Sequence, residues 1–174
     1  MMLTRGGMLI DPLDLDLTKI TLKDVAWALC HVYRWGGHAD PPVTVGEHTA
    51  ACARYLHECG RPLEALAALH HDDGEAFLGD MCRELKTHPL MRAYREAEDK
   101  ASHDLRIHFA PETEGANMVI VKEIDGMSLA REWLDRMHPA PGEIWSTPHL
   151  PLPSWCYQAT TPEDWVALHR ELRA

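Results

Sequence analysis

The sequence lacks a long apolar segment. None of its hydrophobic runs approaches the roughly 20 residues that a helix needs to cross a bilayer, so we expect no membrane-spanning helix. The first residues carry Asp11, Asp14 and Asp16 and no apolar stretch typical of a secretory signal. These two absences predict a cytoplasmic protein.

Basic residues are also few. The chain has 17 lysines and arginines against 27 aspartates and glutamates, a formal net charge of −10. Without a basic stripe, the protein is poorly suited to bind the phosphates of a nucleic acid polymer, and we expect no such partner. A small phosphorylated substrate is compatible with this charge, because a bound divalent cation supplies positive charge locally.

Paired cysteines are absent as well. The five cysteines are odd in number and form no C-x-x-C pair, which predicts free or buried thiols in a reducing compartment. A structural zinc site usually needs a closed set of cysteine and histidine ligands, and these cysteines are badly spaced for one. Histidine is abundant instead, with twelve in 174 residues. Most must lie on the surface, and a site requires only a few to converge.

No alternating apolar–polar run is long enough to build a sheet, so we expect an all-α fold. The length suits one domain, with residues 1–20 as an irregular or short β-like lead-in. Thr21 and Thr161 each begin a capping-box pattern at the start of a helix. Helical spacing and breaker residues predict helices over about 23–33, 45–58, 63–77, 91–109, 115–137 and 161–173.

Residues 138–160 differ from the motif-bearing core, about 21–137, because five prolines prevent a regular helix there. We expect this segment to be an ordered surface excursion of the same domain. Trp145 and Trp155 are the side chains that can pin it to the body of the protein.

The pair His71-Asp72 carries the strongest chemical signal. It lies late in the apolar helix predicted over 63–77, where polar side chains need partners. A metal ion would satisfy both, and imidazole with carboxylate suits Zn, Mn, Fe or Co. His48 and Asp125, each on its own predicted helix, can complete the ligand set. Glu75 follows His71 by one turn, on the same face, and can hold a water or donate a proton.

Local spacing alone leaves another interpretation open, in which His71 and Asp72 make only surface or core hydrogen bonds. The order His48, His71-Asp72, Asp125, however, resembles the H…HD…D signature of the HD-domain phosphohydrolases. Four stretches resemble elements of a small bacterial and phage branch of that family: RWGGH at 34–38, VGEHT at 45–49, LHHDDGEAFLGDMCRELK at 69–86 and VKEID at 121–125. The similarity runs from about residue 13 to 137.

Two groups of that branch inform the function: the phage deoxyadenosine triphosphohydrolases and the bacterial HD-type 5′-deoxynucleotidases. The GGH element and the short length make this chain more similar to the first group. The resemblance implies a helical HD-domain fold and a homo-oligomer, either a dimer or a hexamer. It also implies one divalent transition metal (Zn, Mn, Co or Fe) held by His48, His71, Asp72 and Asp125, with additional Mg for a triphosphate substrate.

The resemblance further implies roles for the residues around the metal. Asp72 and Glu75 would be catalytic, Glu75 by orienting the water or protonating the leaving 5′ oxygen. The substrate would contact Arg34 through phosphate, Trp35 beside C2′ of the sugar, His38, Asp80 through the 3′ hydroxyl, and Lys86 through a distal phosphate. Each of three residues also has a purely structural alternative. Arg34 can form an ion pair with a carboxylate, Trp35 can lie in the core, and His38 can cap a turn.

The sequence departs from the branch at four positions. Asp73 replaces the common alanine after the His-Asp pair, Cys82 and Glu84 replace prolines, and Trp35 stands where many relatives have phenylalanine. The expected reaction is hydrolysis of a deoxynucleotide, with dATP cut to deoxynucleoside and triphosphate as the first choice. A 5′-deoxynucleotidase acting on monophosphates is the main alternative. A hydrolase of signalling cyclic nucleotides and an inactive nucleotide-binding HD protein are the others.

Overall fold

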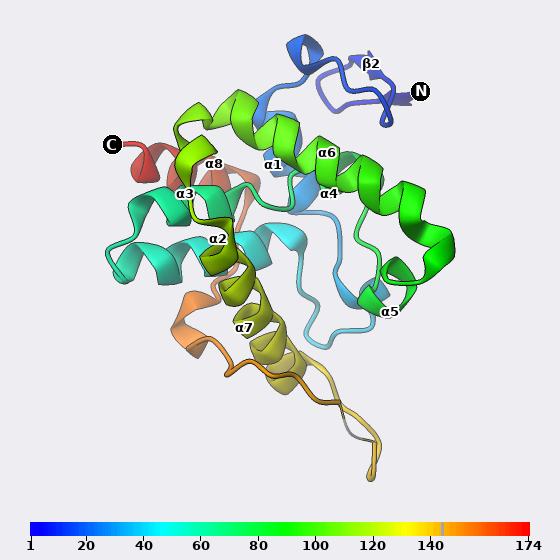
Figure 1. Ribbon diagram of the computed structural model, residues 1–174, viewed down its shortest axis with the longest axis vertical. Helices are drawn as coiled ribbons and strands as arrows, with labels where there is room; N and C mark the ends of the chain where they lie inside the picture. Colours follow the sequence, from blue (N-terminus) through cyan, green and yellow to red (C-terminus); the bar gives the residue numbers. More distant parts are fainter. Residues whose placement is uncertain (144) are drawn as a thin grey trace.

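Figure 1 shows the computed structural model of the chain, which describes residues 1–143 and 145–174. Within these residues the regular secondary structure is helical apart from one small antiparallel sheet, so the predicted all-α fold is confirmed. The sheet, β1 (Met2–Leu3) with β2 (Leu9–Ile10), belongs to the expected lead-in. The helices are α1 (Leu22–Leu29), α2 (Val45–Glu58), α3 (Pro62–Leu69), α4 (Glu75–Leu78), α5 (Arg83–Lys86), α6 (Arg92–Phe109), α7 (Met118–Arg136) and α8 (Pro162–Leu172). No helix of the described chain is long and apolar enough to span a bilayer.

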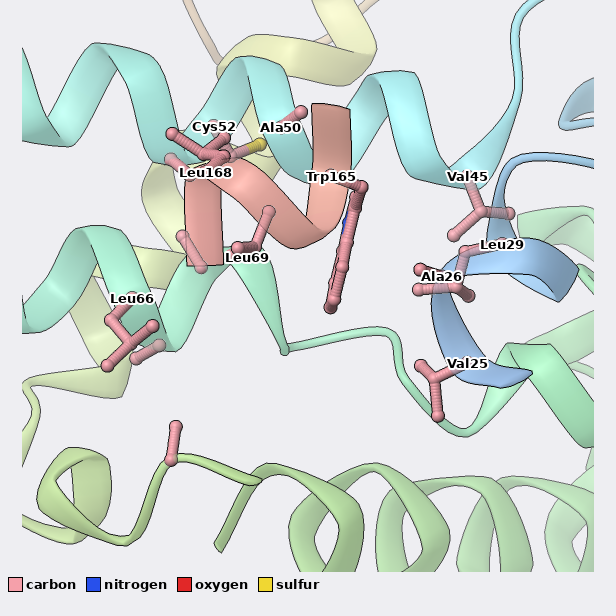
Figure 2. Packing of buried hydrophobic residues seen from close by; sticks show 14 of the residues in the cluster. Val25, Ala26, Leu29, Val45, Ala50, Cys52, Leu66, Leu69, Trp165 and Leu168 are labelled. Carbon is pink, nitrogen blue, oxygen red and sulfur yellow. The ribbon is translucent and has the colours of Figure 1, made fainter. Parts of the chain in front are cut away.

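The hydrophobic core lies where α1, α2, α3 and α8 meet. Trp165 of α8 is fully buried, and in Figure 2 its ring stands between Leu69 and Leu168 on one side and Ala26 on the other. Its indole N–H donates to Thr49 Oγ1 at 3.1 Å, so this large apolar side chain also has a polar partner. The C-terminal helix therefore fixes the α2–α3 pair, which carries much of the candidate site.

Capping boxes start the helices as the sequence predicts. In the boxes at Thr21 and Thr161 the threonine hydroxyl accepts from the third helical N–H, and an aspartate accepts from the threonine N–H. A third box, formed by Thr44 and Glu47, starts α2. Because α2 begins there, His48 lies in its first turn.

Helix α1 is shorter than predicted, ending at Leu29 rather than near residue 33. The chain leaves the helix to run antiparallel to the residues before α2. Arg34 N donates to Val43 O and Val45 N donates to Val32 O, both at 3.0 Å. Long-range pairing has overridden local helix propensity here. Its consequence is that Arg34 lies beside the first turn of α2.

The prediction of a single helix over 63–77 is wrong. Helix α3 ends at Leu69, a turn occupies residues 70–74, and α4 begins at Glu75. Buried polar groups are paired in this turn: His70 Nδ1 lies 2.6 Å from Asp73 Oδ2, and His70 Nε2 lies 2.8 Å from Nδ1 of His169 on α8. The pair His71-Asp72 therefore lies in a turn, and Glu75 is not one helical turn further along the same helix.

Residues 138–143 and 145–160 return along α7 (Figure 1). Leu152 is fully buried, and its N–H donates to Met127 O at 3.0 Å. Trp145 stacks on Trp133 of α7, with ring centroids 4.9 Å apart. The other expected anchor, Trp155, is half exposed. The excursion thereby brings its own side chains close to the candidate site.

Candidate metal centre

His48 of α2 and His71 of the 70–74 turn face each other inside the protein. Their ring centroids are 5.4 Å apart. Both Nε2 atoms are buried, and neither has a hydrogen-bond partner among the described residues. Burying a polar nitrogen without a partner costs free energy. Two such nitrogens on facing imidazoles therefore indicate that a further group, such as a cation, binds between them.

The other nitrogen of each imidazole is occupied. His48 Nδ1 lies 2.7 Å from Glu132 Oε1, with Ser128 Oγ at 3.0 Å. His71 Nδ1 lies 2.7 Å from the backbone oxygen of Ala68. A carboxylate and a carbonyl can only accept, so each Nδ1 carries the proton and each Nε2 keeps its lone pair. This is how metal-binding histidines are oriented in proteins.

Two carboxylates complete the cluster. Asp125 Oδ1 lies 3.0 Å from His48 Nε2 and 3.9 Å from His71 Nε2. Asp72 Oδ2 lies 3.3 Å from His71 Nε2 and 3.8 Å from His48 Nε2. The ligand atoms of His48, His71 and Asp125 lie within 4.8 Å of one another. Two imidazoles and two carboxylates are a suitable ligand set for Zn, Mn, Fe or Co.

The charges in the cluster favour a cation between the histidines. Burial alone would lower the pKa of His71, but Asp72 and Asp125 outweigh it and raise that pKa to about 9. Burial would raise the pKa of Asp125, but its contacts with the two imidazoles hold that pKa well below its usual value. A divalent cation between the two Nε2 atoms would meet the same two carboxylates and be attracted by their charges.

Glu75 lies at the start of α4, 2% exposed. Burial, together with the charges of Asp72 and Asp80, raises its pKa well above the usual value. Lys86 Nζ lies 3.5 Å from Glu75 Oε1 and forms a closer ion pair with the buried Glu98. Glu75 is therefore a candidate to carry and donate a proton beside the cluster.

Arg34 and Trp35 lie against the same cluster. The Arg34 guanidinium is buried, with Nε 2.9 Å from Glu132 Oε2 and a terminal nitrogen 3.7 Å from Asp72 Oδ2. The Trp35 indole N–H donates to Glu132 Oε2 at 2.8 Å. Trp35 has a φ of 59°, which a bulky L-residue adopts only at an energetic cost. Such strain is common at functional sites, where the surroundings enforce it.

The remaining predicted substrate residues are less uniform. Asp80 is half-buried, and burial and the charge of Asp72 raise its pKa although Arg34 opposes this. Lys86 lies in ion-pair contact with Glu75 and Glu98. His38 is exposed at the end of the Trp35–Gly37 turn, and its side chain makes no hydrogen bond with the described residues. The structure therefore brings the four predicted metal ligands together with Glu75, Arg34 and Trp35, and leaves His38 outside the cluster.

A cavity of about 280 Å³ opens beside the cluster. Its lining includes His71 and Asp72, together with Lys86, His103 and Arg106 as cationic or titratable neighbours. This volume is just below the range of pockets that hold small ligands, roughly 300–1,000 Å³. A larger cavity of about 610 Å³ lies between the N-terminal residues and α8, and none of the predicted site residues lines it.

Two functional candidates, Glu132 and Glu98, were not found from the sequence. Glu132 contacts His48, Arg34 and Trp35 from 84 to 98 positions away. The sequence held one signal for it: Glu132 follows Asp125 by seven residues, which is two helical turns on the same face of α7. For Glu98, on the charged helix α6, the sequence held no comparable signal.

No protein family model matches the chain. An uncharacterized protein of Rhodobacter capsulatus is 30% identical to it over 109 residues, which cover 60% of this chain and 55% of that protein. The chain thus matches about half the length of this relative. The site must be interpreted from its own geometry.

Proposed function

We propose that the protein is a metal-dependent phosphohydrolase of the HD type, acting on deoxynucleotides. The observation that carries the proposal is the pair of buried imidazoles, His48 and His71. Each donates its Nδ1 proton to an acceptor and turns an unpaired Nε2 toward the other and toward two carboxylates. His48, His71, Asp72 and Asp125 would hold one divalent transition metal.

A metal in this position would supply a Lewis acid for a phosphoryl oxygen and would lower the pKa of a bound water. The chain's own residues supply the rest of the chemistry. Arg34, charged and planar, binds and orients a phosphate beside Asp72. Water attacks the phosphorus and forms the new phosphorus–oxygen bond, while the buried Glu75 donates a proton to the 5′ oxygen as the old bond breaks; the proton released by the water then returns to Glu75. The products are a nucleoside and the released phosphate or triphosphate.

The preferred substrate in this proposal is a purine deoxynucleoside triphosphate such as dATP, hydrolysed at the α-phosphorus to deoxynucleoside and triphosphate. The similarity to the phage branch and the bulk of Trp35 next to Arg34 support it. One observation favours the second candidate, a 5′-deoxynucleotidase. Lys86, the expected partner of a distal phosphate, is already paired with Glu75 and Glu98.

A substrate screen tests the proposal directly. The purified protein is freed of metal, reloaded with Zn, Mn, Co or Fe, with and without Mg, and given each deoxy- and ribonucleotide as mono-, di- and triphosphate. We expect dATP to yield deoxyadenosine and intact triphosphate. Turnover of monophosphates alone would replace this reaction with the 5′-deoxynucleotidase. Tight binding of a nucleotide without turnover under all metals would support the inactive HD protein.

The metal ligands are tested by elemental analysis. Wild-type protein should hold about one transition metal per chain, and Asp72→Ala should lose it together with activity, because one of four ligands is gone. Asp99→Ala is the matched control, since this exposed aspartate lines the neighbouring cavity without belonging to the cluster. An Asp72→Ala protein that keeps both metal and turnover would contradict the ligand assignment.

A further inference from the structure

We infer that Glu132 is the positioning residue of this site, fixing His48 as a metal ligand and holding Arg34 and Trp35 with the same carboxylate. The inference rests on the proposed metal-dependent function. It concerns a residue that neither touches the metal ligand atoms of the cluster nor belongs to the H…HD…D pattern.

The carboxylate of Glu132 is surrounded by donors. Oε1 accepts from His48 Nδ1 at 2.7 Å and from the hydroxyl of Tyr157 at 2.8 Å. Oε2 accepts from Arg34 Nε at 2.9 Å and from Trp35 Nε1 at 2.8 Å. Glu132 itself is 1% exposed, so water cannot replace a missing partner at low cost. A side chain that receives four hydrogen bonds on two oxygens must act only as an acceptor. Among side chains, an ionised carboxylate has this property.

This arrangement decides which nitrogen of His48 is free. With its proton on Nδ1 and donated to Glu132, the ring presents a lone pair at Nε2, 3.0 Å from Asp125 Oδ1. The opposite tautomer would place a proton on Nε2, inside the cluster. Glu132 is thus the group that makes His48 available to a cation.

The second oxygen connects the metal ligand to the substrate side. Arg34 and Trp35 share Oε2, and Trp35 holds its left-handed backbone conformation while making this contact. Tyr157, from the 138–160 excursion, reaches Oε1 from the other side and also contacts Ser128 Oγ. One buried side chain therefore ties α2, α7, the 32–37 segment and the excursion to the same point.

Glutamine cannot replace this carboxylate. Its amide has one acceptor oxygen, and in either orientation the NH₂ group faces two donors. With the oxygen toward Arg34 and Trp35, the NH₂ would meet His48 Nδ1 and drive the ring to carry its proton on Nε2. We therefore expect Glu132→Gln to bind Co²⁺ or Zn²⁺ about 10–100-fold more weakly than wild type. The visible spectrum of the Co²⁺ protein should also change, which a merely structural role would not produce.

Glu58→Gln is the matched control, because it makes the same change at an exposed position of α2, the helix that carries His48. Tyr157→Phe removes one donor but leaves Oε1 free for His48, so its metal affinity should stay within a few-fold of wild type. Glu132→Gln with wild-type affinity and an unchanged Co²⁺ spectrum would overturn the inference. A wild-type protein that binds neither metal would overturn the proposed function as well.

A measurement on the wild type covers the case in which Glu132→Gln does not fold. Nitrogen-15 NMR of the Zn²⁺-loaded protein reports the protonation of each imidazole nitrogen. His48 should carry its proton on Nδ1, in a slowly exchanging hydrogen bond, with Nε2 unprotonated. A His48 with the proton on Nε2 in a protein that holds its Zn²⁺ would contradict the positioning role and leave the metal-dependent function standing.

Discussion

At the scale of single residues, the chemistry divides between groups that hold a cation and groups that handle the substrate. Glu75 belongs to the second kind, because its Oε1 lies 3.5 Å from Lys86 Nζ and it is not among the grouped metal-binding atoms of His48, His71 and Asp125. Glu75→Ala should keep its metal and lose roughly 10²–10⁴-fold in turnover on the substrate that the screen identifies. Metal content and turnover are measured on the same sample. Loss of metal along with activity would make Glu75 a ligand instead.

Trp35 is the residue with which we expect the site to distinguish deoxyribose from ribose. Its indole is fixed by Glu132 and lies against Trp145, with ring centroids 6.1 Å apart, so it is poorly able to move away from a 2′ hydroxyl. Trp35→Ala should weaken the preference for dATP over ATP. For comparison, a pocket that can open rejects one added hydroxyl group only about 10²-fold. Trp155→Ala, at a half-exposed tryptophan, is the control. Equal rates on both nucleotides in wild type, unchanged by Trp35→Ala, would remove the sugar-selection hypothesis.

The candidate ligands were predictable from the sequence because their order along the chain resembles a known pattern. Their orientation was not. The acceptor for His71 Nδ1 is a backbone oxygen, Ala68 O, and backbone acceptors leave no trace in residue type. The acceptor for His48 Nδ1 is Glu132, an acidic residue among 27. Its position two turns after Asp125 places it on the same face of α7, but the packing of α7 against α2 is what brings it to His48. Residue patterns thus identify ligands more readily than the groups that orient them.

At the scale of secondary structure, the predictions succeeded where the signal is local. The threonine–aspartate capping boxes at Thr21 and Thr161, with glycine and proline breakers, set most helix ends to within a few residues. They failed at 30–33 and 70–74, where the backbone is set by long-range partners: Val43 in the first case, His169 in the second. Both failures lie next to candidate site residues. Local rules are most often broken at sites for this reason.

Gly74 is the element-scale position that allows the 70–74 turn to approach α6. A Cβ built on it would lie 2.7 Å from Ser102 Oγ and 2.9 Å from the backbone oxygen of Glu98. Gly74→Ala should therefore destabilise the fold by about 1–3 kcal/mol, as overpacking does, and displace Glu75. Urea unfolding measures the first effect and turnover the second. Gly115→Ala is the control, since its Cβ would meet nothing within 4 Å. Equal unfolding midpoints for the two variants would contradict this account.

At the scale of the whole molecule, the net charge of −10 contrasts with a site proposed to bind an anionic substrate. A bound cation and Arg34 would supply the positive charge locally, so substrate affinity should depend strongly on the metal. The expected homo-oligomer, a dimer or a hexamer, stays a prediction. Light scattering of the purified protein coupled to size-exclusion chromatography would determine its mass, and a monomer across a wide concentration range would contradict it.

We expect the fold to respond to acid through His169, which joins α8 to the site-bearing turn. Burial and the nearby His70 lower the pKa of His169 to about 4, from a usual value of 6.5. The unfolded chain therefore binds the proton more readily than the folded one. Stability from the neutral His169 is fully present above about pH 6.5 and is lost as the pH falls toward 4.

His169→Gln keeps a donor for His70 Nε2 but cannot titrate, so its stability should fall less steeply than that of wild type between pH 6.5 and 4. His57→Gln, at an exposed histidine of α2, should follow the wild-type curve. Urea unfolding across this pH window measures the difference between variants, which cancels the titration of the groups they share. Parallel curves for wild type and His169→Gln would show that this histidine is not held neutral. The contact between α8 and the 70–74 turn would then contribute nothing to the acid sensitivity of the fold.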